Sequence, residues 1–221
     1  NSLNEILSKN KHQNLGGYKS GNLNINPGKY GVKIFSLLND LNFKNYFNFL
    51  TDEKIEDFKP IFGGNLNLIN SKNQFFHTDG NWNPRMIVVN IATTKIGDEN
   101  GPLEIIEKSH SKKMSYFQFI IKSLFLKKKK IRLNFGDILI REHRLWHRGT
   151  KNKSEINREM IGIALLKGDQ ENHKISEVQN LYLHSNIFGI SKREKLKEYM
   201  FLNFKFILFF YKLLISIIKK N

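Results

Sequence analysis

Between residues 61 and 167 the sequence is a series of short apolar runs separated by Gly, Asn, Asp and Pro. Several of these runs alternate apolar and polar residues. Short strands with turn signals at such intervals are typical of a β-sandwich or β-barrel, and Asn100-Gly101 is a good tight-turn dipeptide. We therefore predict a β core with strands in IFGGNLNLIN at 61–70, NQFFHTD at 73–79, RMIVVNIATT at 85–94, GPLEIIEKS at 101–109, KIRLNFGDILIRE at 130–142, RLWHRG at 144–149 and REMIGIALLK at 158–167.

Helical patterns flank and interrupt this core. Residues 31–50 carry apolar residues at helical spacing and predict an amphipathic helix, and Thr51 or Asp52 is expected to cap a further short helix. Residues 114–126 predict a helical insertion that ends in a run of lysines. We divide the chain into N-terminal loops and supporting helices at 1–60, the β core at 61–190, and one basic, apolar C-terminal helix at 191–221.

Composition limits the kind of site that the chain can carry. Its 221 residues suit one domain with a sizeable core, and the absence of cysteine excludes disulfides, thiolate metal sites and cysteine nucleophiles. Any metal must be held by His, Asp or Glu, a ligand set that favours catalytic iron, manganese or zinc. The formal net charge of +16 is compatible with nucleic acid, an anionic membrane or an acidic substrate, but also with a general bias toward Lys, Asn and Ile.

A histidine and an aspartate stand two positions apart in QFFHTDGNW. Residues i and i+2 of a strand point to the same face, so at a strand end His77 and Asp79 would converge. A later histidine, His147, completes a set of two imidazoles and one carboxylate. This facial triad leaves three positions open and suits non-haem Fe(II). The alternative is a surface turn with a satisfied histidine.

An arginine opens the apolar strand that follows His147. The cosubstrate of such iron oxygenases is usually 2-oxoglutarate, whose distal carboxylate needs a buried cation. Arg158 suits this task, because a guanidinium binds a carboxylate through two parallel hydrogen bonds and keeps its charge. A surface ion pair with Glu155 or Glu159 is the alternative.

Taken together, residues 60–166 resemble the phytanoyl-CoA dioxygenase (PhyH) family of Fe(II)/2-oxoglutarate-dependent dioxygenases. Four elements carry the resemblance in order: His77-x-Asp79, ENGPLEIIEKSHS, FGDILI and HRGTKNKSEINR. The resemblance implies a mainly β fold with flanking helices, namely a double-stranded β-helix (jelly roll, cupin-like) that forms the catalytic core. It also implies the site residues: His77, Asp79 and His147 as the catalytic iron ligands, and Arg158, Asn90 and Thr150 as contacts of 2-oxoglutarate.

The activity implied by the resemblance is hydroxylation of an unactivated C–H bond with O2, releasing succinate and CO2. The substrate would be a small metabolite, anionic or lipid-linked. Asp79 favours hydroxylation, because related halogenases have a small residue there to admit chloride. Two other classes stay open: a non-catalytic jelly-roll module that binds metal or ligand, and a nucleic-acid-binding protein. We expect no nucleic-acid partner, since no strand alternates aromatic and basic residues.

The C-terminal segment decides the expected location of the protein. Residues 200–218 contain thirteen Phe, Leu or Ile residues together with Lys205 and Lys212. On an insertion scale, about 0.3–0.6 kcal/mol per apolar residue nearly cancels roughly 2.5–3.5 kcal/mol per lysine, so a spanning helix is marginal. Peripheral membrane contact through residues 195–220 and docking on the barrel or on a dimer partner both remain open. Without a signal-peptide pattern, we expect a cytoplasmic protein, with membrane association as the variant.

Other residues near the motifs receive lesser roles. Trp146 is expected to pack in the core and Trp82 to line the substrate mouth, while His110 and His143 are expected at the surface or beside the site. Basic side chains that could attract an anionic substrate are Arg85, Arg144, Arg148 and the four lysines at 127–130.

Overall fold

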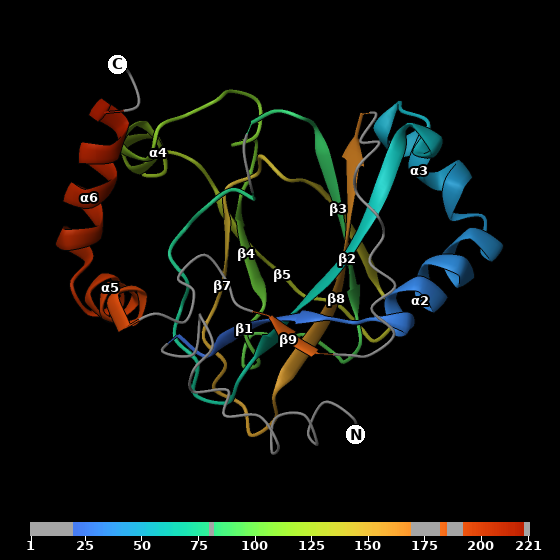
Figure 1. Cartoon of the computed structure of the whole chain (residues 1–221), viewed down its shortest axis with the longest axis horizontal. Helices are drawn as coiled ribbons and strands as arrows, with labels where there is room; N and C mark the ends of the chain where they lie inside the picture. The colour runs from blue at the N-terminus through green and yellow to red at the C-terminus, as the bar shows by residue number, and fades with distance from the viewer. Residues whose placement is uncertain (1–19, 80–81, 169–181, 185–191, 219–221) are drawn as a thin grey trace.

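The computed structural model describes residues 20–79, 82–168, 182–184 and 192–218, and within this part nine strands form two antiparallel sheets that face each other (Figure 1). The larger sheet has the order β6 (Ile138–Glu142), β3 (Met86–Ala92), β8 (Arg158–Lys167), β2 (Phe58–Asn67), β1 (Asn22–Asn26) and β9 (Tyr182–His184). The smaller sheet has the order β5 (Lys128–Ile131), β4 (Leu103–Ile106) and β7 (His147–Gly149). This arrangement confirms the mainly β fold and the double-stranded β-helix.

The two faces of the larger sheet carry different kinds of side chain, and the central strand β8 shows this most clearly. Ile161, Ile163 and Leu165 point to one face, where they join the apolar core. Because side chains alternate along a strand, Arg158 and Gly162 point to the opposite face, toward the smaller sheet. The core is completed by residues of α2 (Lys29–Asp40) and α3 (Phe43–Thr51), which cover the outer face of the sheet (Figure 1).

The helix predicted over residues 31–50 is two helices, and the short helix predicted after it is a single 3-10 turn that neither Thr51 nor Asp52 caps. Leu41 ends α2, and Asn42 adopts a left-handed conformation with φ 62°, which asparagine tolerates better than most residues. Thr51 is the last residue of α3 and Asp52 is left-handed as well, so neither caps a new helix. The next element along the chain is one turn of 3-10 helix, η2 (Ile55–Asp57).

The insertion predicted at 114–126 contains α4 (Tyr116–Lys122). A capping box starts this helix, because the Ser115 hydroxyl accepts from the Gln118 backbone and the Gln118 side chain accepts from the Ser115 backbone. Phe119 is fully buried and stacks on Trp146 with ring centroids 3.8 Å apart. Trp146 is thus a core residue, as predicted, and it holds α4 against the smaller sheet.

The single C-terminal helix predicted for 191–221 is also two helices, α5 (Lys192–Asn203) and α6 (Lys205–Ile218). Phe201 and Leu208 are buried in a cluster with Phe75 and Tyr116, so this segment docks on the protein beside α4 (Figure 1). No helix in the described residues is both long and apolar enough to cross a bilayer. The division of the chain at residues 60 and 190 stays a prediction, and residues 1–19 lie outside the described part.

The contact between α3 and β2 gives a test of this packing. Phe47 is fully buried and meets Phe58 edge to face at 5.5 Å, so Phe47→Ala should lower the free energy of unfolding by about 3–5 kcal/mol. Phe49 lies on the same helix but is 85% exposed, and Phe49→Ala should change it by no more than about 0.5 kcal/mol. Urea unfolding followed by circular dichroism measures both. Equal losses would contradict this assignment of the core.

Candidate metal centre

Two histidines seventy positions apart in sequence are joined through their backbones. The His77 N–H donates to the His147 carbonyl and the His147 N–H donates to the His77 carbonyl, both at 3.0 Å. The predicted strand at 73–79 is therefore only an isolated bridge beside β7 rather than a regular strand. Asp79, two residues after His77, is held in place as well, because its backbone N–H donates to the His143 carbonyl at 2.9 Å.

These backbone contacts bring three candidate metal ligands together. One ligand atom from each of His77, Asp79 and His147 lies within 4.8 Å of the other two. Asp79 Oδ1 is 3.5 Å from His147 Nε2 and 3.9 Å from His77 Nε2. Small side-chain rotations are enough to bring such atoms onto one ion at the usual bond lengths of about 2.0–2.2 Å. The donor set of two imidazoles and one carboxylate fits iron.

Each histidine is oriented by a carbonyl two residues before it. His77 Nδ1 lies 2.9 Å from the Phe75 oxygen, and His147 Nδ1 lies 2.8 Å from the Leu145 oxygen. A carbonyl only accepts hydrogen bonds, so Nδ1 carries the proton in both rings. The lone pair is then on Nε2, the atom that faces Asp79, which is the tautomer that a metal ligand needs.

The surroundings keep the ligands in the protonation states that bind metal. Burial by itself raises the pKa of Asp79, but electrostatic interactions with His147, Arg141 and His77 hold this pKa well below its usual range. Burial and the charge of Arg141 lower the pKa of His147 to about 3. At neutral pH Asp79 is a carboxylate and His147 a neutral imidazole, so neither has to lose a proton before metal binds.

Arg141 belongs to this centre, although the sequence analysis did not single it out. Its Nη2 lies 2.7 Å from Asp79 Oδ2, and its Nε donates to Asn90 Oδ1 at 3.1 Å. Asp79 therefore keeps Oδ2 on the arginine and turns Oδ1 toward the histidines. Alternation along β6 was the missed signal, because it places Arg141 on the opposite face from Ile140, which packs on the apolar core.

Arg158 lies on the same inner face at the start of β8. It is only 2% exposed, and its Nη2 donates to the Gly101 carbonyl at 3.0 Å. Within the described part of the chain its Nε and Nη1 are buried and make no hydrogen bond, nor is it paired with Glu155 or Glu159. Burial lowers the pKa of Arg158 to about 10. A bound carboxylate would satisfy both orphaned groups and remove this penalty.

Further along β8 from Arg158, the inner face of the larger sheet has no side chain at two neighbouring positions. Gly63 and Gly162 are directly opposite each other on β2 and β8, and Gly162 is opposite Asn90 on β3. A Cβ added at Gly63 would have no atom closer than 3.9 Å, and one at Gly162 none closer than 3.4 Å. Neither glycine is therefore required by crowding.

Asn90 and Thr150, the other two predicted cosubstrate contacts, are both buried and hydrogen-bonded to protein. Asn90 Oδ1 accepts from Arg141. The Thr150 hydroxyl donates to the Pro102 carbonyl at 2.7 Å, so its proton is engaged in holding the chain before β4. Their contact with 2-oxoglutarate stays a prediction.

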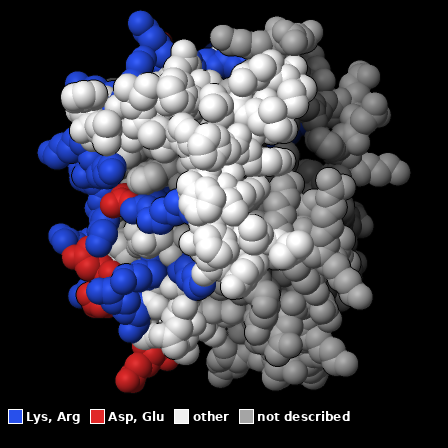
Figure 2. All heavy atoms as spheres, turned by 90° about the vertical axis from the view of Figure 1, so that its left-hand side faces the viewer, with Lys and Arg blue, Asp and Glu red and all other residues white. Residues whose placement is uncertain are grey.

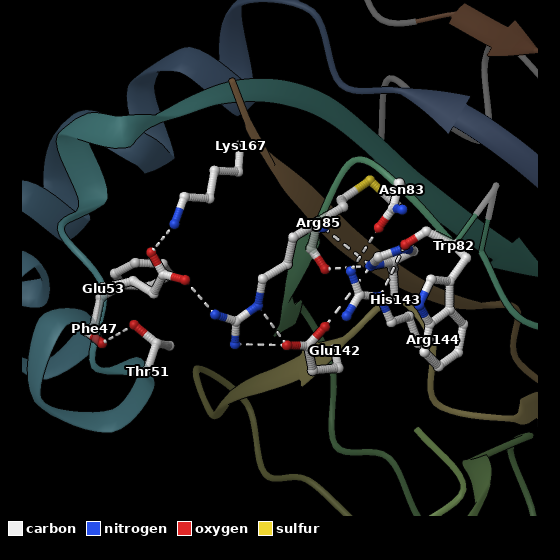
Figure 3. Close-up of polar contacts among 11 residues, drawn as sticks. Phe47, Thr51, Glu53, Trp82, Asn83, Arg85, Glu142, His143, Arg144 and Lys167 are labelled. Carbon is white, nitrogen blue, oxygen red and sulfur yellow. Dashed lines mark hydrogen bonds and ion pairs between the residues drawn. The ribbon is translucent and has the colours of Figure 1, made fainter. Parts of the chain in front are cut away.

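Charged residues at and just after the end of β6 contact Trp82, Asn83 and Arg85 (Figure 3). Glu142 Oε1 pairs with Arg85 at 2.6 Å, and Arg85 and Lys167 both pair with Glu53. Arg144 donates to the Trp82 carbonyl at 2.9 Å and lies over the Trp82 ring at 4.7 Å. These contacts hold residues 82–85 in place.

The ion pairs and hydrogen bonds of the structure also bear on the roles expected of several other residues. Arg85 and Arg148 carry charges that are already paired, Arg148 with Glu104 at 2.6 Å, so neither is a strong candidate for attracting substrate. His143 is buried next to Met86 and outside the triad, whereas His110 is exposed.

Comparison with known proteins gives a family match and a fold match. The family model described as phytanoyl-CoA dioxygenase (PhyH) matches residues 37–160, and no curated protein matches the chain. Among solved structures, EvdO2 from Micromonospora carbonacea var. aurantiaca is 14% identical, with 68% of each chain covered and a TM-score of 0.51. This likeness supports the jelly-roll fold.

Two further solved structures are similar over a smaller part. EvdMO1 is 21% identical with a TM-score of 0.45, covering 51% of this chain and 28% of that one. AviO1 from Streptomyces viridochromogenes Tue57 is 19% identical with a TM-score of 0.44, covering 52% of each. The chain thus spans between about a quarter and a half of the length of these two proteins.

Metal titration tests the triad directly. His77→Ala and Asp79→Asn should each weaken Fe(II) binding by about 100-fold or more, since changes to groups that only support a ligand already cost roughly 10–100-fold. The matched control is Asp98→Asn, because Asp98 is an exposed aspartate paired with Arg132. Anaerobic calorimetry measures the affinities. Fe(II) affinity in Asp79→Asn equal to that of the wild type would show that the metal lies elsewhere.

Proposed function

Because the chain belongs to the phytanoyl-CoA dioxygenase family of Fe(II)- and 2-oxoglutarate-dependent oxygenases, we propose that it is a 2-oxoglutarate-dependent dioxygenase that hydroxylates a C–H bond of a small metabolite. One observation supports this most strongly. His77, Asp79 and His147 can place one ligand atom each within 4.8 Å of one another, and the buried Arg158 has two nitrogens without a hydrogen-bond partner in the described part of the chain. The donor set suits iron, and the arginine suits the far end of a dicarboxylate.

The chemistry that the iron centre supplies when bound is the activation of O2: one oxygen atom enters the substrate, and the other enters 2-oxoglutarate, which leaves as succinate and CO2. The protein would contribute orientation. His77 and His147 would present Nε2, and Arg141 would keep Asp79 turned so that one carboxylate oxygen faces the ion. Arg158 would bind the distal carboxylate of 2-oxoglutarate, and Asn90 and Thr150 would line the same space.

A non-catalytic metal-binding module is the main alternative. It would have the same triad and bind metal, yet never form succinate. The two buried N–H groups of Arg158 favour the enzyme, because a module that only binds metal has no need for a buried, unpaired guanidinium.

Succinate release tests the enzyme proposal and the role of Arg158 together. With Fe(II), ascorbate and a panel of small metabolites, the wild type should form succinate. Arg158→Gln should raise the 2-oxoglutarate concentration for half-maximal rate by roughly 30–140-fold, because a charge-assisted hydrogen bond worth about 2–3 kcal/mol is lost. Arg132→Gln removes the same charge at an exposed ion pair and should leave the requirement unchanged. Metal binding without any succinate would instead favour the non-catalytic module.

We also propose that the side formed by α4 and α6 contacts an anionic membrane surface. The docked α6 still presents Phe206, Phe210 and Leu214 to solvent, and the end of α4 presents Leu124 and Phe125. Figure 2 shows this side of the molecule, with a broad area of uncharged side chains and, along one edge, many basic side chains with a few acidic ones among them. An exposed apolar face beside lysines is the pattern of an interfacial helix.

Vesicle co-sedimentation tests the membrane proposal with the intact chain. The wild type should pellet with vesicles that contain anionic lipid and less with neutral ones, because each lysine near an anionic surface contributes about 1 kcal/mol. The double variant Phe206→Glu and Phe210→Glu should lose most of this binding. Tyr46→Glu with Phe49→Glu, which changes exposed residues of α3, should retain it. A different result would be a wild type that does not pellet with vesicles but forms a dimer. If the Phe206→Glu and Phe210→Glu variant is then a monomer, the face binds a second copy of the chain.

A further inference from the structure

A cavity of about 480 Å³ lies between the edge strand β6 and the smaller sheet. Its wall includes Ile105 of β4, which is directly opposite His147 on β7. The cavity therefore borders the candidate metal centre. The volume is that of a site for a small organic molecule. Its lining residues are Ile105, Glu107, Lys108, His110, Leu139, Ile140, Arg141, Glu142 and Leu145.

Arg141 gives this cavity a chemical preference. Its side chain is only 8% exposed, and two of its three nitrogens are engaged by Asp79 and Asn90. The third, Nη1, is buried and has no hydrogen-bond partner in the described part of the chain. A buried guanidinium nitrogen that remains unpaired is costly, and an oxyanion is the partner that suits it best.

The other charged residues of the cavity fit the same ligand. Lys108 and His110 are exposed and lie at its rim, and both can attract an anion. Glu142 also lines the cavity, but its Oε1 accepts hydrogen bonds from Arg85, whose charge offsets it. The remaining oxygen of Glu142 is an acceptor that suits a donor group on the ligand. Glu107 is the other carboxylate in the cavity wall, and its charge disfavours an anionic ligand. The preference of the cavity for an anion therefore depends on Arg141.

We propose that this cavity is the primary-substrate site and that it binds a carboxylate or phosphate group of the substrate through Arg141 Nη1, assisted by Lys108. The inference rests on the proposed dioxygenase function and adds the substrate class: small metabolites that carry an oxyanion near the carbon to be oxidised. Arg141 then has two roles in one side chain. It orients the metal-binding carboxylate, and it anchors the substrate beside the iron.

The binding of small anionic and neutral fragments tests the proposal without knowledge of the full substrate. The probes are propionate, methylphosphonate and the neutral isostere propionamide, titrated by calorimetry into anaerobic protein with Fe(II) and saturating 2-oxoglutarate. At least one anion should bind at a single site, about tenfold or more tightly than propionamide, because a charge-assisted hydrogen bond is worth about 1.5–3 kcal/mol. Binding of propionate alone indicates a carboxylate substrate, and of methylphosphonate alone a phosphate one.

Variants locate the anion. Arg141→Gln should weaken anion binding about tenfold or more, while Arg132→Gln, the matched loss of an exposed arginine, should not. Because Arg141 also contacts Asp79, the iron content of Arg141→Gln is measured alongside, and Lys108→Gln provides an exposed second variant that should weaken binding about threefold. Equal binding of propionamide and both anions, no saturable anion binding, or anion binding unchanged in both variants would overturn the inference.

The two proposals can fail separately. Anion binding that depends on Arg141 in a protein that forms no succinate would leave the oxyanion site standing and remove the dioxygenase. Succinate formation in a protein whose cavity shows no anion preference would keep the dioxygenase and remove the inference about its substrate.

Discussion

The reciprocal hydrogen bonds between His77 and His147 are the contact on which the site depends. They join the segment after β2 to the smaller sheet across seventy residues of sequence, and they set both imidazoles side by side, with ring centroids 4.5 Å apart. Each ring is then turned by its own carbonyl partner. The backbone N–H and the carbonyl of each histidine are both hydrogen-bonded to the other histidine. The geometry of the centre therefore follows from ordinary sheet pairing.

The alternation of β3, β6 and β8 divides the larger sheet into a structural face and a functional face. The outer face is apolar and packs on α2 and α3, whereas the inner face carries two arginines, an asparagine and two glycines. Two guanidinium groups in a protein interior cost stability unless they have partners. Here Arg141 receives one from Asp79, and Arg158 has only a backbone carbonyl. The protein thus supplies a carboxylate partner for Arg141 but none, among the described residues, for Arg158.

Much of this was predictable from the sequence, and the failures have physical reasons. The candidate ligands His77, Asp79 and His147 and the buried Arg158 could be singled out because their residue types and order are unusual for a core. Arg141 was missed because its role depends on the register of β6. The helix breaks at Asn42 and Phe204 interrupt continuous apolar patterns, so periodicity did not reveal them. The segment 73–79 has the residue pattern of a strand, but it pairs with β7 at one bridge only.

Gly63 and Gly162 give the site a means of adaptation. A methyl group at either position would meet no atom closer than 3.4 Å, so an alanine there is sterically tolerated. The inner face of the sheet can thus gain one carbon at either position while His77, Asp79 and His147 stay in place. Evolution can therefore change the shape of this face, and with it the choice of small molecule, through substitutions at two positions that the fold itself leaves unconstrained.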